Sequence, residues 1–257
     1  MKITILTLFP DMFSGIFNNS IIKRAIAKSI ITIDIVNIRD FTNDKYGRVD
    51  SAPIGGGAGL IMKCQPIVDA LKSIDSKGRK ILLSASGDTY KQTKARELAD
   101  LKEDIILICG HYEGVDKRIE NHIDESISIG DYILTGGEIG AMVITDSIIR
   151  LLDGAIASES IVEESFENDV LEYPQYTEPY DFEGHKVPDI LYSGNHIAIQ
   201  KWRRKESLKL TKEKRNDLFS KLELNKVDRA LLKEIDSNEV PKWEIEAIQK
   251  GHKFIKK

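Results

Sequence analysis

One glycine-rich stretch of this chain is best suited to binding a ligand. Residues 129–138 read IGDYILTGGE, with three glycines within eight positions, and an apolar, helix-like segment follows them to Arg150. Because a glycine carries no Cβ, a ligand can approach its backbone closely. We therefore expect this stretch to bind a nucleotide-like cofactor through main-chain N–H and C=O groups.

Two other stretches of small residues also follow predicted strands. Residues 84–87 read SASG at the end of the predicted strand 80–84, and residues 110–116 read GHYEGVD after the apolar run 105–109. We expect a further strand to end at Leu134, just before its own glycines. Ligands bind beyond the carboxyl ends of the strands in open parallel sheets. The three strand ends therefore predict one shared pocket.

A fourth glycine-rich segment does not follow a strand. Residues 53–59 read PIGGGAG, with four glycines in five residues, so they form a loop rather than the interior of an element. The pattern fits a loop that a ligand or another backbone approaches, and it also fits a flexible surface loop.

Charge is distributed unevenly along the chain, whose net charge is −4. Residues 1–172 hold 19 Lys and Arg against 27 Asp and Glu, whereas residues 173–257 hold 18 against 14. Eight of the fifteen residues in 201–215 are basic. Taken alone, this run favours a solvated helix face over a phosphate-binding surface.

Several common chemistries have no support in the sequence. GxGxxG, GxxxxGK[ST] and GxSxG motifs are absent, so an ordinary dehydrogenase, a P-loop enzyme or an esterase is not indicated. Two cysteines, Cys64 and Cys109, cannot build a disulfide framework, and the five histidines lack metal-ligand spacing. The apolar run 3–9 is too short for a signal peptide or a membrane span, so we expect a cytoplasmic protein without membrane association.

The elements that would position these residues follow a strand–helix pattern. We expect strands at 2–8 and 31–36 around a helix from Asp11, whose inward face carries Phe13, Phe17, Ile21 and Ala25. We expect further helices at 66–74, 91–101 and 138–152. The pattern predicts a parallel-sheet α/β domain over residues 1–158, an acidic linker over 159–172 and a smaller, mainly helical domain over 173–257.

Taken together, the motifs resemble those of the bacterial tRNA (guanine-37-N1)-methyltransferase family, the TrmD family of the SPOUT superfamily. The resemblance follows the order of the chain and covers nearly all of it. It rests on these segments: LFP (8–10), Asp50 with Pro53 and the glycines 55–57, GHYEGVD (110–116), IGDY (129–132), GGE (136–138), and LYSGNH (191–196) with Trp202 and Arg203.

The resemblance implies a fold and partners that periodicity does not reveal. The first domain would be a SPOUT domain with a C-terminal trefoil knot, an exception to the rule that chains avoid knots. Two copies would form a homodimer with the active site at the subunit interface, and the helical domain would hold tRNA.

The resemblance also implies that the predicted pocket binds S-adenosylmethionine, the methyl donor. The residues carried over to this pocket are Ser84, Ala85, Gly110, Glu113, Gly114, Ile129, Gly130, Asp131, Tyr132, Ile133, Leu134, Gly136 and Gly137. Ala85 stands where the family commonly has proline, a difference in size that leaves the pocket plausible.

Two residues would carry the proton chemistry that the resemblance implies. Guanine N1 holds a proton that a base must remove, while a cation stabilises the negative charge that develops on O6. Arg150 would be the cation. The base would be Glu164 before Ser165-Phe166, where the family has aspartate, and Asp169 is the second candidate.

The remaining implied residues would contact the tRNA. Asp50, Gly55 and Gly59 would lie near the flipped guanine, although Ile54 beside them replaces a common tyrosine. Ser193, Asn195 and His196 precede the basic run. The run itself would supply phosphate contacts from Lys201, Arg203, Arg204, Lys205, Lys209 and Lys212. The resemblance also allows Mg²⁺ as a helper ion, although the sequence offers no dedicated cage for it.

Two other functions remain open from the sequence. A knotted methyltransferase could act on another RNA position, such as a ribose 2′-hydroxyl. The glutamate at position 164 also fits a catalytically weakened RNA-binding module.

Overall fold

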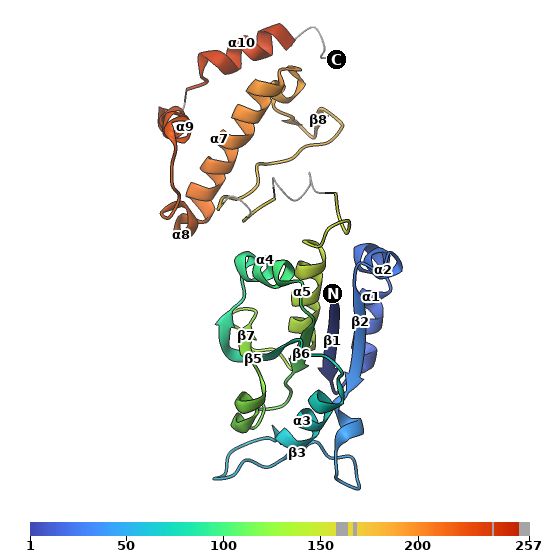
Figure 1. The fold of residues 1–257 in the computed structure, drawn as a ribbon. Coiled ribbons are helices and arrows are strands. Elements are labelled where there is room, and N and C mark those ends of the chain that lie inside the picture. The colour runs from blue at the N-terminus through green and yellow to red at the C-terminus, as the bar shows by residue number, and fades with distance from the viewer. Residues whose placement is uncertain (158–163, 167–168, 238, 252–257) are drawn as a thin grey trace. The chain divides into compact units, whose positions relative to one another are not determined.

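The computed structural model describes residues 1–157, 164–166, 169–237 and 239–251. The chain divides into two compact units, Met1–Ser158 and Glu159–Lys257 (Figure 1). The predicted linker 159–172 falls partly outside the described residues.

A five-stranded sheet forms the centre of the first unit. Its order is β2-β1-β6-β5-β7, and every pairing is parallel. This finding confirms the predicted parallel α/β class. The strands are β1 (Lys2–Thr7), β2 (Thr32–Asn37), β5 (Arg79–Thr89), β6 (Ile105–Cys109) and β7 (Glu125–Ser128).

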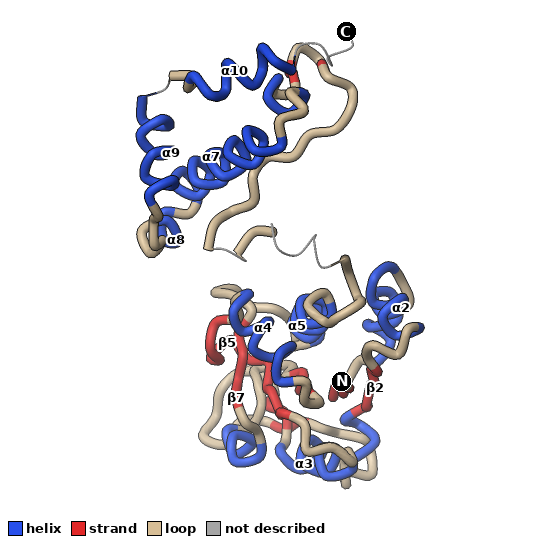
Figure 2. Tube along the Cα trace, turned by 45° about the horizontal axis from the view of Figure 1, so that its top comes forward, coloured by secondary structure: helices blue, strands red, loops and turns tan. Residues whose placement is uncertain are grey.

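Helices cover both faces of this sheet (Figure 2). Along β1, Ile3 and Ile5 belong to the core on one face, whereas Leu6 belongs to the core on the other. All five residues of the central strand β6 are buried, as expected for a strand covered on both faces. The first face packs against α1 (Ser14–Phe17), α2 (Ser20–Ala27), α4 (Gln92–Leu101) and α5 (Glu138–Ile149), and the second against α3 (Cys64–Ser73).

Two predicted elements differ from the structure. The strand expected to end at Leu134 already ends at Ser128, whose hydroxyl donates to Gly130 O and accepts from Gly130 N. Gly130 has a φ of +153°, so the chain turns into a loop there. The helix expected from Asp11 breaks before Ser20 (φ +52°), and Ile22 rather than Ile21 is buried.

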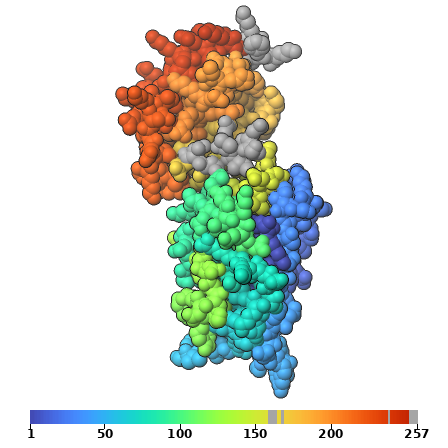
Figure 3. All heavy atoms as spheres, in the orientation of Figure 1, coloured from blue at the N-terminus to red at the C-terminus, as the bar shows by residue number. Residues whose placement is uncertain are grey.

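A short hairpin projects from the sheet and carries the PIGGGAG loop. Its strands are β3 (Asp50–Ser51) and β4 (Ile61–Met62). Met62 N donates to Gly114 O at 2.9 Å, and Asp116 N donates to Met62 O at 2.9 Å. The hairpin is therefore fixed to the GHYEGVD segment at its base, while its tip, light blue in Figure 3, reaches into solvent with Ile54 fully exposed.

The second unit is mainly helical. Its longest helix is α7 (His196–Lys214), capped by the Asn195 side chain, which accepts from Ala198 N at 3.2 Å. Among the residues that the structure describes, no helix is both long and apolar enough to cross a membrane. The described part of the unit also contains α8 (Asn216–Phe219), α9 (Lys226–Ser237) and α10 (Lys242–Gly251), and a hairpin joins β8 (Asp181–Phe182) to β9 (His185–Lys186).

Candidate active site

The loops after β6 and β7 meet through direct backbone contact. Gly137 N donates to Gly110 O at 2.8 Å, and His111 forms an isolated antiparallel bridge with Gly136. A Cβ on Gly137 would lie 2.8 Å from Cys109 Cα and 3.1 Å from Gly110 N. Position 137 therefore admits only glycine if this approach is to be kept.

The third segment is turned toward these loops by a bulge in β5. The register between β5 and β7 shifts between Leu83 and Asp88, so Ser84, Ala85 and Ser86 leave the ladder. Bulges commonly re-aim side chains beside functional sites. The Ser84 hydroxyl accepts a hydrogen bond from Ser86 N at 3.3 Å, which holds the bulge in shape.

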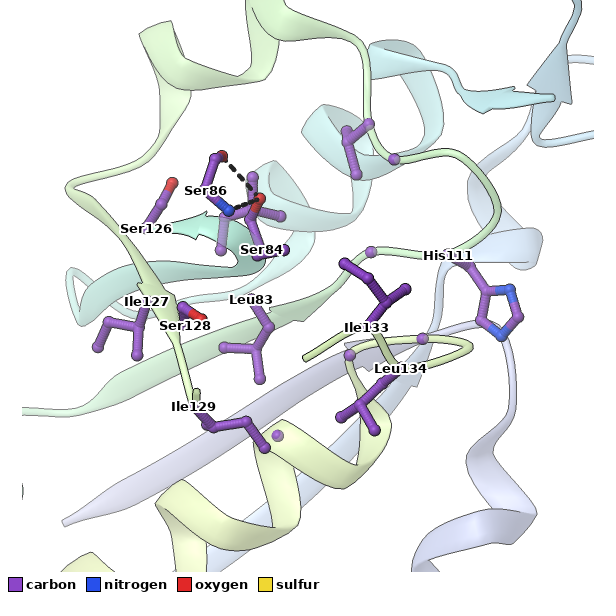
Figure 4. Close-up of a pocket in the computed structure, with 18 of the residues that line it drawn as sticks. Leu83, Ser84, Ser86, His111, Ser126, Ile127, Ser128, Ile129, Ile133 and Leu134 are labelled. Atoms are coloured by element: carbon purple, nitrogen blue, oxygen red, sulfur yellow. Dashed lines mark hydrogen bonds between the residues drawn. The ribbon is translucent and has the colours of Figure 1, made fainter. Parts of the chain in front are cut away.

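These three segments enclose a cavity of about 480 Å³ (Figure 4). This volume falls within the usual range for small-molecule sites. Apolar side chains such as Leu83, Ile127 and Ile129 share its lining with serine hydroxyls and bare glycine backbone. Such a lining can pack against a flat apolar ring and read its polar edge through main-chain groups.

Twelve of the thirteen residues predicted for cofactor binding line this cavity, and Asp131 does not. Their role in cofactor binding stays a prediction. The cavity also includes residues that the sequence reasoning missed, among them Ser126, Ser128 and Gly140. Gly140 could have been found from the sequence, because it follows the GGE motif by two residues. In the structure, a Cβ at this position would lie 2.7 Å from Leu83 Cδ1.

A buried carboxylate locks the start of α5 to β1. Glu138 is 2% exposed, and its Oε1 accepts from Thr7 Oγ1 at 2.8 Å. The same hydroxyl accepts from Phe9 N at 2.9 Å, which joins the LFP segment to the GGE segment. The glycines before α5 are therefore held from both sides.

The hairpin tip reaches one edge of the cavity through Gly59. A Cβ on Gly59 would lie 2.6 Å from Oε1 of Glu113, a cavity residue, so the backbone of Gly59 touches that side chain. Gly55, by contrast, has open space around its Cβ position. Of the three residues predicted to lie near guanine, Asp50 is half-buried at the base of the hairpin.

Arg150 lies far from this cavity within the same chain. It follows the last residue of α5, whereas the cavity glycines lie before the helix or, for Gly140, in its first turn. The rise from Gly140 to Arg150 spans ten residues, which corresponds to about 15 Å at 1.5 Å per residue. Arg150 therefore does not line the cavity of its own copy.

The predicted base belongs to the other unit. Glu164 is half-buried in the described residues 164–166, and Asp169 has a φ of +56°. Because the cavity and Glu164 lie in separate units, the structure defines no distance between them.

Much of the basic run on α7 is engaged in ion pairs inside the second unit. Arg204 donates to both carboxylate oxygens of Asp228, at 2.8 and 3.0 Å. Lys201 pairs with Glu234, Lys205 with Glu244 and Lys212 with Asp236. The Arg203 guanidinium lies 4.6 Å from the centre of the Tyr173 ring. These contacts hold α7 to its neighbours, and Lys209 remains exposed.

The residues that precede this run have structural roles as well. Ser193 is 6% exposed, and its Oγ accepts from Asn195 N at 3.2 Å. His196 is exposed at the start of α7.

Neither cysteine is suited to nucleophilic chemistry. Burial raises the pKa of the Cys109 thiol well above its ordinary value. Burial also raises the pKa of Cys64, with the Asp116 charge adding to the effect. Among the described residues, no group of three His, Cys, Asp or Glu side chains could hold a metal ion.

Known proteins resemble this chain over nearly its full length. The family described as tRNA (Guanine-1)-methyltransferase TrmD matches residues 1–221. A tRNA (guanine-N(1)-)-methyltransferase of Clostridium botulinum (strain 657 / Type Ba4) is 52% identical over 239 residues, covering 92% of this chain and 99% of the relative. Relatives of the same name from Clostridium acetobutylicum and Clostridium perfringens are also 52% identical, covering 90% and 91% of this chain and 96% and 99% of their own lengths. The similarity therefore extends over both units.

Proposed function

This chain belongs to the tRNA (guanine-1)-methyltransferase family, and we propose that it transfers a methyl group from S-adenosylmethionine to N1 of guanine 37 in tRNA. It is accordingly a methyltransferase that acts on guanine N1 of tRNA. The observation that carries this conclusion is the family match across residues 1–221, which includes every glycine loop of the cavity.

The cavity fits S-adenosylmethionine on physical grounds. Added Cβ atoms at Gly137 and Gly140 would lie 2.8 Å from Cys109 Cα and 2.7 Å from Leu83 Cδ1, so the segments that line the cavity pack tightly against β6 and β5. The loops of residues 84–86, 110–114 and 129–137 would hold the donor. When bound, the donor supplies a methyl group on a sulfonium, which is already a good leaving group.

Two residues of this chain would remove the proton of guanine and stabilise the negative charge that follows. Glu164 would remove the proton from guanine N1, and Arg150 would stabilise the negative charge that develops on O6. The reaction rate depends strongly on the placement of these groups, because misplacement by about 1 Å can lower the rate on the order of 10²-fold.

A homodimer would complete the site, with Arg150 of one copy serving the cavity of the other. The separation of about 15 Å along α5 supports this arrangement, since Arg150 does not line the cavity of its own copy. The surface of α5 supports it as well, because Ile139 and Val143 are 45% and 43% exposed one helical turn apart. Apolar side chains in such an array fit a partner surface.

The finer features of the fold belong to the same proposal. A trefoil knot would form where residues 129–157 pass the ends of β5 and β6, and the close approach of Gly137 to Cys109 supports such tight threading. The unit that contains α7 would hold tRNA through phosphate contacts weakened by salt, and the enzyme would act in the cytoplasm, where tRNA matures.

Methyl transfer to a matched pair of tRNAs tests this function. The protein is incubated with methyl-labelled S-adenosylmethionine and either a tRNA with guanine 37 or its guanine-37→adenine variant. We expect label in the first tRNA alone. Label in both would favour a methyltransferase for another RNA position, and donor binding without transfer would favour a weakened RNA-binding module.

A further inference from the structure

The segment that carries Glu164 is docked along α7. Leu171 N donates to Thr211 Oγ1 at 2.8 Å. The Arg215 guanidinium, just past the end of α7, lies 5.6 Å from the centre of the Phe166 ring, and that of Arg203 lies 4.6 Å from the Tyr173 ring. The described residues Phe166, Leu171 and Tyr173 contact Arg215, Thr211 and Arg203 in turn, so this series of contacts runs antiparallel to the helix.

An apolar anchor fixes the same segment. Val170 is 7% exposed and packs in one cluster with Leu208 of α7 and Leu231 of α9, both fully buried. The anchor and the Leu171–Thr211 hydrogen bond lie on adjacent residues. Together they fix both the side chain and the backbone of the segment at this point.

Two further hydrogen bonds connect this anchor back to Glu164. Phe166 N donates to Val170 O at 3.0 Å, and Glu172 N donates to Ser165 Oγ at 2.9 Å. Ser165 and Phe166 directly follow Glu164 in the chain. The backbone beside the carboxylate is therefore tied to residues that α7 holds in place.

Thr211 stands at the centre of this arrangement. It is fully buried, and its hydroxyl donates to Ser207 O at 2.6 Å while accepting from Leu171 N. The donated bond fixes the orientation of the hydroxyl, so its lone pair faces the segment.

We propose that Thr211 is a positioning residue that sets the place of the Glu164 carboxylate for proton removal. This inference rests on the proposed function of Glu164 as the base. The helix that bears the predicted phosphate contacts would then also hold the base, so tRNA binding to the second unit would carry Glu164 to the guanine.

The Thr211→Val variant tests this role, because valine keeps the shape of threonine and removes the hydroxyl. Under single-turnover conditions with saturating donor and tRNA, we expect the methylation rate to fall about tenfold or more, because small misplacements of catalytic groups lower the rate by such factors. The dissociation constants for donor and tRNA should stay within about twofold. Thr211→Ser, which keeps the hydroxyl, should restore most of the rate, and Glu213→Gln at an exposed position of the same helix should leave it unchanged.

A double-mutant cycle separates positioning from general damage. In a Glu164→Gln background, Thr211→Val should cause no further loss, since the group it positions is already gone. A full additional loss in that background would overturn the inference. Val170→Ala, which loosens the segment from its other anchor, should lower the rate in the same way, and circular dichroism should show that each variant is folded.

The outcomes also distinguish this inference from the proposed function. If Glu164→Gln methylates at the unmodified rate, the assignment of the base fails, and the inference fails with it. If Glu164→Gln is slow but Thr211→Val and Val170→Ala retain the full rate, only the inference is overturned.

Discussion

Position 164 carries a glutamate where the family resemblance implies an aspartate, so the base has one more methylene to accommodate. We expect Glu164→Gln to lower the single-turnover methylation rate by about 10²-fold or more, because general-base catalysis contributes about that much. Glu164→Asp keeps a carboxylate and should retain more of the rate. Rapid-quench measurement with saturating tRNA checks both. A near-normal rate for Glu164→Gln beside an inactive Asp169→Asn would transfer the role to Asp169.

Asp228 offers a prediction about stability and pH. Its side chain is 2% exposed, and the hydrogen bonds from Arg204 lower its pKa. A depressed carboxyl pKa stabilises the folded state above the unfolded pKa of about 3.9, and this contribution disappears as pH falls through the folded pKa. We expect Asp228→Asn to reduce the free energy of unfolding at pH 7 by about 2 kcal/mol.

Urea unfolding of the two proteins at several pH values checks this prediction. The difference between them should be full at pH 7 and should shrink as pH falls below about 4. A difference of the same size at pH 7 and pH 3 would show that the ion pair is not its source.

Among the elements, the loop before α5 is the one most tightly constrained. A Cβ on Gly137 would lie 2.8 Å from Cys109 Cα, so Gly137→Ala should push the loop away from Gly110. We expect the dissociation constant for S-adenosylmethionine to rise about tenfold or more, since the backbone cradle would open. Calorimetric titration measures this directly. Gly15→Ala is the matched control, because a Cβ there meets nothing within 4 Å.

Strands buried on both faces were predictable because their apolar runs are continuous. The runs at β1 and β6 matched the observed strands closely. The apolar residues Ile129, Ile133 and Leu134 misled the prediction because they line a cavity rather than extend the sheet. Sequence pattern cannot distinguish burial against a ligand pocket from burial in a sheet.

Contacts between residues far apart in the sequence limited how much of the candidate site could be predicted. The glycine loops were identifiable from local sequence, and twelve of the residues predicted for cofactor binding line one cavity. The partners of the basic run were not identifiable, because Asp228 and Glu244 lie 24 and 39 residues from Arg204 and Lys205. Because these acidic partners are not visible in the local sequence, the sequence predicts that more basic side chains of α7 contact phosphate than the ion pairs indicate.

At the scale of the whole molecule, the separation of Arg150 from the cavity predicts complementation between two inactive chains. Gly137→Ala impairs the cavity and leaves Arg150 intact, whereas Arg150→Ala does the reverse. In a mixed dimer, one site would combine an intact cavity with an intact arginine. We expect co-expressed variants to recover about a quarter of the normal activity, given random pairing in a two-fold dimer. A mixture as inactive as its parents would contradict a shared site.

The central claim is that this molecule places a methyl group on N1 of guanine 37, and the product nucleoside tests it most directly. A guanine-37 tRNA is incubated with the protein and S-adenosylmethionine, digested with a sequence-specific ribonuclease, and analysed by mass spectrometry of the fragments and nucleosides. The account predicts 1-methylguanosine in the fragment that contains position 37. A methyl group on a ribose, on another base or at another position would contradict it, as would an unmethylated tRNA.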